Sequence, residues 1–433
     1  MKILYISQYF PPEMGAPAAR AAELSRHWAR AGHDVTVLTG FPNHPTGVVA
    51  PEYRSRFRRL VGQEDLDGVN VVRTWLLPLP NRKAYERMLN YSSFAVSAAA
   101  TGTFVESPDV VIASSPQLLV GLPGWWVSRT KRVPLIFEVR DLWPESLAAV
   151  GMGDERSLVH RSLGAVAKFL YKRSDHIVVV TPAFRDYLLD RYHVPSEKLS
   201  VIENGVETDL FQPQPPEPEI TRHLRAEGKF VVSYIGTVGM AHGLTTLIEA
   251  AERLQESAPH VLFIVIGEGA DKARVMQAAQ DRSLTNVRFI DQQPRERIPL
   301  YIAASDACLV LLKKSEIFKT VIPTKMLEFM SCGRPVILAV DGQARTIMQA
   351  ANGGIYVEPE NATELSQAVL RLGDDPQLRR TLGQNGRGYV MRHFSRAVTA
   401  KRYLGVMEQV PRNQQRPAMA PEQCSVRASP RQY

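Results

Sequence analysis

The residues best suited to chemistry lie in one segment, IPTKMLEFMSCGRPVIL, at positions 322–338. Pro323 has the fixed φ that suits the first turn of a helix. At 100° per residue, Thr324, Lys325 and Glu328 share one face of that helix. A hydroxyl and an ammonium at a helix N-terminus favour an anion, and a carboxylate one turn later can bind a ribose diol. The segment therefore predicts a nucleoside-diphosphate site, with an ordinary amphipathic helix carrying a Lys–Glu pair as the structural alternative.

Two glycine-containing turns support this prediction. The stretches YIGTVGMAHG (234–243) and IGEGAD (266–271) each follow an apolar run and precede a helical pattern. Glycine lets backbone amides approach a phosphate, and Glu268 could accept from a hydroxyl. Each turn is a weak signal alone, because such turns often contain glycine for structural reasons; together with the first segment they favour a phosphate site. The glycines concerned are Gly236, Gly239, Gly267 and Gly269.

Short β-branched runs alternate with helical patterns along the chain and would position these turns. The first series of expected strands is 3–7, 34–40, 69–74, 109–114, 134–139 and 176–181, with helices at 16–31, 82–105, 117–131, 155–173 and 183–191. The second series is 230–236, 260–267, 286–290, 306–312, 334–340 and 353–357, with helices between them. Strands this apolar are buried on both faces, which predicts α/β domains with parallel sheets covered by helices on each side.

A proline-rich connection separates the two series. Residues 199–216 contain an Asn-Gly turn followed by prolines, a composition that makes a stiff connector. We therefore expect two doubly wound, Rossmann-like domains at 1–205 and 206–388, and a polar, disordered tail at 411–433. Ligands in such folds bind at the carboxyl ends of strands, so two facing lobes would put the site in the cleft between them.

Composition limits the class of protein. The 433 residues carry a net charge of +8 and are 45% hydrophobic, which is typical of a soluble globular protein with two domains. Three cysteines (Cys308, Cys332 and Cys424) exclude a disulfide framework and favour buried thiols in a reducing cytosol. The N-terminus lacks the apolar stretch of a signal peptide. No His/Cys cluster has metal-ligand spacing, and no nucleic-acid-binding motif accompanies the charge.

Basic and uncharged segments indicate a surface contact. Residues 54–132 carry eleven Lys and Arg against six Asp and Glu, beginning with the run RSRFRR. Such a surplus suits phosphates or an anionic membrane surface. The segments 88–105 and 110–128 hold no charged side chain, but polar residues in the first and two prolines in the second disfavour a membrane span. We interpret them as buried helices or as a helix lying in the membrane interface.

The chain resembles the group 1 (family 4) retaining glycosyltransferases, which have the GT-B fold, over about residues 1–405. The resemblance rests on the ordered motifs GHDVTVLT, ENGVETDLF, YIGTVGMAHGLTTLIEAAERL, IGEGAD, NVRFI and PTKMLEFMSCGRPVI. RDLWPESL, GFPNHPTG and FKTVIPTK are closer still to a bacterial subgroup that builds O-antigen and colanic-acid-type polysaccharides, including N-acetyl-fucosaminyl transferases. The resemblance also implies that a C-terminal helix at about 389–409 packs back on the first domain.

The resemblance implies roles for single residues. Glu328 matches the second glutamate of the family's E-x7-E motif, near the donor ribose, and Gly15 matches the glycine-rich loop that faces the donor diphosphate. Residues 267–269 match the loop near the nucleoside. Arg140 and Asp141 lie where the family usually has an active-site histidine.

The resemblance is incomplete at charged positions. The first glutamate of E-x7-E falls at Thr320, and the arginine and lysine that clamp the diphosphate fall at Thr237 and His242. The charge at the leaving group must then come from elsewhere. We expect it from Lys319 and Lys325, helped by the helix N-terminus and nearby backbone amides. A protonated His242, or donor binding without turnover, is the alternative.

The acceptor-side candidates lie in the first domain. Asp141 and Glu145, beside Arg140, are the acidic groups expected at the acceptor hydroxyl or the sugar, with an exposed helix start as the alternative. Asn43 and His44 follow the second expected strand, where they could meet the acceptor or form an ordinary surface loop. In the front-face course that the family implies, the leaving phosphate assists deprotonation of the acceptor, so no second carboxylate is required.

These observations predict a retaining glycosyltransferase that moves a sugar from a UDP- or GDP-type donor to a lipid-linked or oligosaccharide acceptor in bacterial surface polysaccharide synthesis. The expected location is the cytoplasm, with peripheral contact to the cytoplasmic face of the inner membrane. No cofactor, metal or nucleic acid is expected. A UDP-sugar epimerase on the same fold and a non-catalytic donor-binding subunit are the alternatives.

Overall fold

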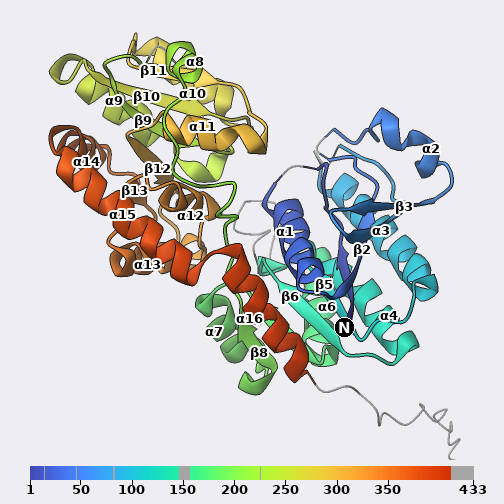
Figure 1. Cartoon of the computed structure of the whole chain (residues 1–433). Coiled ribbons are helices and arrows are strands. Elements are labelled where there is room, and N and C mark those ends of the chain that lie inside the picture. Colours follow the sequence, from blue (N-terminus) through green and yellow to red (C-terminus); the bar gives the residue numbers. More distant parts are fainter. Residues whose placement is uncertain (14, 45, 81–82, 146–156, 225, 411–433) are drawn as a thin grey trace, which may run out of the picture.

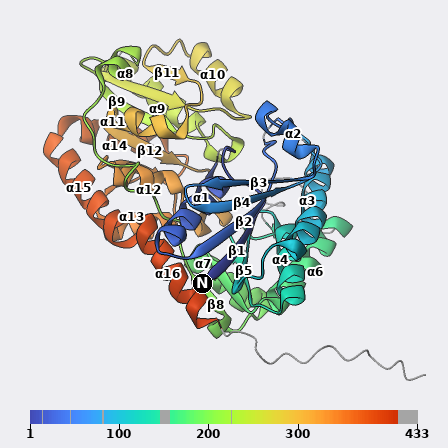
Figure 2. The ribbon, with the colours of Figure 1, turned by 45° about the vertical axis from the view of Figure 1, so that its right-hand side comes forward.

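The chain forms two α/β lobes, each built on its own sheet (Figure 1). The computed structural model describes residues 1–13, 15–44, 46–80, 83–145, 157–224 and 226–410. The chain enters the second lobe after β8 and returns through α15 into α16, which lies against the first lobe (Figure 2). The tail predicted to be disordered lies outside the described residues.

The first lobe contains an eight-stranded sheet in the order β3-β4-β2-β1-β5-β6-β7-β8, in which only the β3–β4 pair is antiparallel. β5 and β6 are buried along their whole length, as expected for strands covered on both faces. The strands are β1 (Lys2–Ser7), β2 (Asp34–Gly40), β3 (Val61–Leu66), β4 (Val69–Thr74), β5 (Val110–Ser114), β6 (Leu135–Val139), β7 (His176–Val179) and β8 (Leu199–Val201). The helices are α1 (Ala16–Arg30), α2 (Arg54–Phe57), α3 (Ala84–Phe104), α4 (Gly121–Lys131), α6 (Leu158–Arg173) and α7 (Pro182–Tyr192).

Strand β3 has no apolar run that would predict it, because its sequence, VGQEDL, is mostly polar and it pairs along one side only, at the edge of the sheet. The signal lies in the turn that joins it to β4. Asp67 and Gly68 have positive φ values of 56° and 80°, the backbone that an Asp-Gly hairpin turn requires.

The second lobe contains a six-stranded parallel sheet in the order β11-β10-β9-β12-β13-β14. The strands are β9 (Phe230–Ile235), β10 (Val261–Ile266), β11 (Val287–Ile290), β12 (Ala307–Leu311), β13 (Val336–Ala339) and β14 (Gly354–Tyr356). The helices are α8 (Pro218–His223), α9 (Thr245–Ser257), α10 (Lys272–Asp281), α11 (Ile298–Ala303), α12 (Thr324–Ser331), α13 (Gln343–Ala351), α14 (Ala362–Asp374) and α15 (Pro376–His393). Cys308 and Cys332 are buried and free.

The chain crosses between the lobes at two segments that lie side by side. Val206 and Ser395 form a parallel bridge. The Val206 amide donates to the Phe394 carbonyl at 2.9 Å, and the Arg396 amide donates to the Val206 carbonyl at 2.8 Å. These paired crossings form the joint between the lobes.

The helix expected at about 389–409 is two helices. α15 ends at His393, and α16 (Arg396–Gln409) begins after Ser395, whose side chain caps its N-terminus. α16 packs on α1 of the first lobe, where Trp28 Nε1 donates to the Ala400 carbonyl at 3.1 Å. The last helix of the chain therefore belongs to the first lobe by its packing.

Candidate active site

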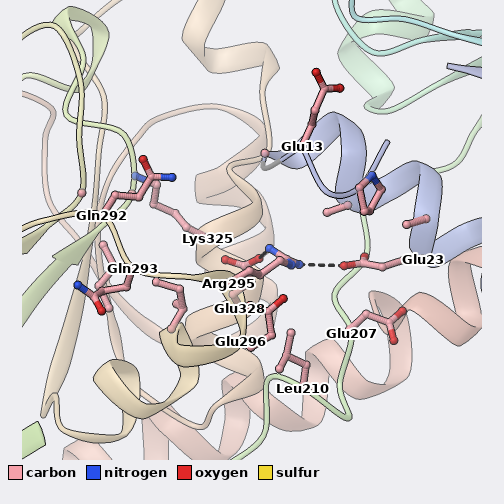
Figure 3. Close-up of a pocket in the computed structure, with 18 of the residues that line it drawn as sticks. Glu13, Glu23, Glu207, Leu210, Gln292, Gln293, Arg295, Glu296, Lys325 and Glu328 are labelled. Carbon is pink, nitrogen blue, oxygen red and sulfur yellow. Dashed lines mark hydrogen bonds and ion pairs between the residues drawn. The ribbon is translucent and has the colours of Figure 1, made fainter. Parts of the chain in front are cut away.

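A cavity of about 960 Å³ lies between the two lobes. The first lobe contributes the loop after β1 and one face of α1, and the second contributes the loops after β9, β10 and β11 and the start of α12 (Figure 3). These loops follow the carboxyl ends of parallel strands, which is where doubly wound folds bind ligands. The cavity is therefore the candidate active site.

Lys325 brings a cation into the cavity from the first turn of α12. Its Nζ donates to the Tyr234 hydroxyl at 3.0 Å, and that hydroxyl donates to the Thr237 carbonyl at 2.6 Å. Burial lowers the pKa of Lys325 to about 7, because desolvation outweighs the attraction of Glu328. A phosphate placed beside Nζ would favour the charged form, so this lysine is suited to binding an anion.

The glycine turns are pressed closely around Lys325. Gly236 has φ 141°, and a Cβ there would lie 2.8 Å from Lys325 Nζ. A Cβ at Gly267 would lie 2.0 Å from the Gly236 carbonyl oxygen. Gly236 needs glycine because of its positive φ, and Gly267 needs it because the turns after β9 and β10 pack backbone against backbone there.

Only some of the amides in these turns are available to a phosphate. The Gly236 amide donates to the Ile266 carbonyl at 2.9 Å, and the Val238 amide donates to the Glu268 carbonyl at 2.8 Å. Both bonds hold the turn after β9 to that after β10. The expected contribution of backbone amides at the diphosphate is therefore smaller than the glycine pattern suggests.

Glu328 is held by an arginine that no motif indicated. Arg295 opens the short 3-10 helix η5 (Arg295–Arg297), and its Nη1 donates to Glu328 Oε1 at 2.9 Å. Its Nη2 donates to Glu23 Oε1 on α1, also at 2.9 Å (Figure 3). Burial raises the pKa of Glu328, and the Arg295 guanidinium opposes that rise. Lys325 and Glu328 thus line one wall of the cavity, an ammonium and a carboxylate one helical turn apart.

The structure brings most of the predicted donor-side residues together. Those that line the cavity are Gly15, Gly236, Thr237, Gly267, Glu268, Lys325 and Glu328. Those predicted for the same site that do not line it are Gly239, His242, Gly269, Lys319 and Thr324.

Lys319 and His242 require a correction. Lys319 lies in the 3-10 helix η6 (Ile317–Thr320), where its Nζ pairs with Glu316 Oε1 at 2.7 Å and its side chain is 38% exposed. Burial and the nearby Lys325 lower the pKa of His242 to about 4, so this ring is neutral near pH 7. Of the three groups expected to replace the family's basic clamp, Lys325 is the one that lines the cavity.

The predicted acceptor-side residues Asn43, His44, Arg140, Asp141 and Glu145 lie outside the cavity lining. The backbone amides of the first two donate to Glu13 Oε1 at 2.9 Å each. Arg140 Nη2 donates to the Ala16 carbonyl at 3.1 Å and so holds the start of α1. Glu145 accepts from the Tyr192 hydroxyl at 3.1 Å. Asn43, His44 and Arg140 therefore hold the loops beside the cavity, and Glu145 contacts α7 of its own lobe.

Glu13 is a cavity residue that the sequence pattern did not reveal. It lies in the loop after β1, and its carboxylate lines the cavity while it holds the loop after β2. Burial raises the pKa of Glu13 to about 7, although the two amide bonds act in the opposite direction. The sequence signal that could have revealed Glu13 is its position in the loop after the first strand, where doubly wound folds bind ligands.

Arg295 and Glu23 were also missed, for different reasons. Arg295 lies in QQPRER, immediately after β11, so the rule that ligands gather at strand ends could have found it. Glu23 lies on α1 among buried positions, where a carboxylate is uncommon, and its two partners, Arg295 and Arg396, come from segments far away in the sequence.

Comparison with known proteins identifies both halves of the chain. Residues 15–205 match the glycosyl transferase 4-like domain, and residues 217–389 match the glycosyl transferases group 1 domain. Among curated proteins, the chain is similar to the putative colanic acid biosynthesis glycosyl transferase WcaI of Escherichia coli K12. The two are 24% identical over 388 residues, covering 85% of this chain and 91% of WcaI.

Solved structures show the same two-lobed fold. Sucrose-phosphate synthase of Thermosynechococcus elongatus superposes with a TM-score of 0.72 at 22% identity, covering 94% of this chain and 98% of that one. Anabaena Alr3699/HepE in complex with UDP-glucose superposes with a TM-score of 0.69 at 17% identity, covering 94% and 99%. The fold is GT-B, as predicted.

Proposed function

Because the chain belongs to the group 1 glycosyltransferases, we propose that it transfers a sugar from a UDP- or GDP-sugar to a lipid-linked or oligosaccharide acceptor in bacterial surface polysaccharide synthesis. The observation that carries this proposal is the pairing of Lys325 and Glu328 on one wall of the interlobe cavity, facing the glycine turns. The ammonium suits a diphosphate and the carboxylate suits a ribose diol.

The cavity supports transfer by electrostatic stabilisation of the leaving group. The bond between the anomeric carbon and the diphosphate oxygen breaks, and Lys325 neutralises charge that develops on that oxygen. The acceptor oxygen bonds to the anomeric carbon on the same face, and its proton passes to the leaving phosphate. This course retains configuration and uses no metal and no second carboxylate.

The comparisons support a UDP-sugar as donor and a role in polysaccharide synthesis. The solved relative HepE carries UDP-glucose, and the curated relative WcaI is named for colanic acid biosynthesis. These properties belong to the two relatives, and for this chain they are part of the proposal.

A peripheral membrane contact suits a lipid-linked acceptor. No helix among the described residues is long and apolar enough to cross a membrane. α3, however, lies on the side of the first lobe away from the second (Figures 1 and 2), and it carries a stripe of exposed, uncharged residues. The stripe consists of Tyr85, Leu89, Ser92, Val96, Ala100 and Phe104, with Val96 73% and Phe104 88% exposed. An apolar stripe of this kind on a helix of about 30 Å suits the membrane interface.

Exposed arginines lie on α2, which is linked to α3 through Trp75. Phe57 of α2 stacks on Trp75, whose carbonyl accepts from Ser97 of α3, so α2 adjoins α3. The exposed arginines of α2 and its ends are Arg54, Arg56, Arg58 and Arg59. Basic groups next to an apolar stripe favour an anionic lipid surface.

Ligand-induced stabilisation tests the donor proposal. We expect UDP or GDP and one of their sugars to raise the melting temperature, since a ligand of the native state stabilises by mass action. Lys325→Ala and Glu328→Ala should each abolish most of that shift. The matched control is Lys319→Ala, which removes an exposed lysine six residues away from the same segment and should keep the shift. A full shift in Lys325→Ala and Glu328→Ala would contradict the donor site, and sugar conversion without any acceptor would indicate an epimerase.

A further inference from the structure

A continuous chain of charged groups crosses the cavity. Glu328 Oε1 accepts from Arg295 Nη1 at 2.9 Å, and Glu23 Oε1 accepts from Arg295 Nη2 at 2.9 Å (Figure 3). The second oxygen of Glu23 accepts from Arg396 Nε at 2.8 Å. Carboxylates and guanidiniums thus alternate in the order Glu328, Arg295, Glu23 and Arg396, from α12 in the second lobe to α16.

The members of this chain come from three separate parts of the fold. Glu328 and Arg295 belong to the second lobe, Glu23 belongs to α1 of the first lobe, and Arg396 opens α16 at the joint between the lobes. The joint is the place where Val206 pairs with Ser395. The charged chain therefore connects the joint to the residue expected at the ribose.

Burial makes the geometry of this chain specific. The side chains of Glu23 and Arg396 are only 6% and 3% exposed, and the Arg295 guanidinium lies 5.0 Å from the centre of the Phe211 ring. A buried carboxylate that loses a partner keeps its desolvation cost without the compensating attraction. Arg396 holds Glu23 in place on α1. Among these four charged residues, Arg295 is therefore the one whose position can change when the lobes move.

The bond between Arg295 and Glu23 passes from one lobe to the other. It forms only while the cleft is narrow enough to keep the two side chains in contact, because N–H···O hydrogen bonds span about 2.7–3.2 Å. When the lobes separate, Arg295 loses its hydrogen bond to Glu23 on α1. Arg295 can still bind Glu328, but its own side chain is then less firmly positioned. Closing the cleft therefore gives the arginine that holds Glu328 its second anchor.

We propose that Glu23 is a positioning residue for the donor site, which acts through Arg295 to hold the Glu328 carboxylate and so couples closure of the cleft to nucleotide binding. The bond to Arg295 uses one oxygen of Glu328, and the other oxygen can accept from the ligand. The proposal rests on the proposed function for the identity of the ligand, a nucleoside-diphosphate sugar.

The test is Glu23→Gln, which keeps the size and one acceptor oxygen but removes the charge. We expect the donor KM to rise about tenfold, the loss typical of one charge-assisted hydrogen bond, while the acceptor KM stays unchanged. Arg295→Gln should raise the donor KM at least as much, and the double variant should be no worse than Arg295→Gln alone, because the two residues act as one unit. The matched control is Glu252→Gln, which removes the carboxylate partner of Arg282; neither of these two residues lines the cavity.

Two results would overturn the proposal. A donor KM unchanged in Glu23→Gln but raised in Arg295→Gln would mean that Arg295 acts on the ligand without Glu23. Small-angle scattering of the ligand-free proteins gives an independent measurement: Glu23→Gln should have a larger radius of gyration than the native chain, and equal radii would contradict the coupling. If the native chain binds no nucleotide at all, the proposed function fails, and the scattering comparison still decides whether Glu23 holds the cleft closed.

Discussion

The pH dependence of donor affinity tests the role of Lys325. In the donor-free protein, burial lowers the pKa of Lys325 to about 7. A diphosphate beside Nζ favours the ammonium, so binding raises that pKa toward its ordinary value. Below pH 7 the lysine is charged before the donor arrives, and its contribution to affinity is complete. Above pH 7 the free protein must first take up a proton, so donor affinity falls by up to tenfold per pH unit, or about 1.4 kcal/mol.

Isothermal titration with whichever nucleotide sugar stabilises the protein measures this effect. Between about pH 7 and pH 8.5 the dissociation constant should rise roughly fifteenfold, and titrations in two buffers should show uptake of nearly one proton at about pH 8. Lys325→Arg is the control, because a guanidinium stays charged throughout this range. An affinity of the native protein that does not change with pH would refute the reasoning. An equal slope in Lys325→Arg would assign the titration to another group, such as Glu13.

Three further outcomes follow from the packing. Trp28→Phe removes the indole bond to α16 and should lower the free energy of unfolding by about 2–4 kcal/mol, measured by urea denaturation. Gly267→Ala places a Cβ 2.0 Å from a backbone oxygen and should lower the melting temperature by several degrees, whereas Gly405→Ala, with nothing within 4 Å on α16, should not lower it. Val96→Asp on α3 should weaken co-sedimentation with anionic vesicles, and Met391→Asp, an exposed position on α15, should leave it unchanged; equal binding by both variants would contradict the lipid contact.

The fold and one wall of the site could be predicted from the sequence because their signals are local. Apolar runs of five to eight residues predict the parallel strands except β8, which lies in the segment expected to be a connector. The spacing of Lys325 and Glu328 on one helix predicts their shared face. The polar hairpin strand β3 has no such signal in its own residues.

The contacts between lobes could not be predicted, because no local pattern specifies how two domains face each other. Glu23 and Arg295 are separated by 272 residues and meet only across the cleft. Lys319 illustrates the opposite error, since it is close to Lys325 along the chain. η6 ends between the two lysines, and Lys319 pairs with Glu316 three residues earlier, so nearness in sequence did not bring it to the cavity.

The position of Lys325 suggests how a clamp residue could be replaced without loss of charge at the diphosphate. The resemblance places the family's arginine at Thr237, whose carbonyl accepts from Tyr234, and the Tyr234 hydroxyl accepts from Lys325. The lysine of this site therefore lies at the start of α12, with one tyrosine between it and the turn after β9. The exchange changes the chemistry as well as the location. An arginine would carry its charge in the empty cavity, whereas the lowered pKa of Lys325 lets this site gain its charge together with the ligand.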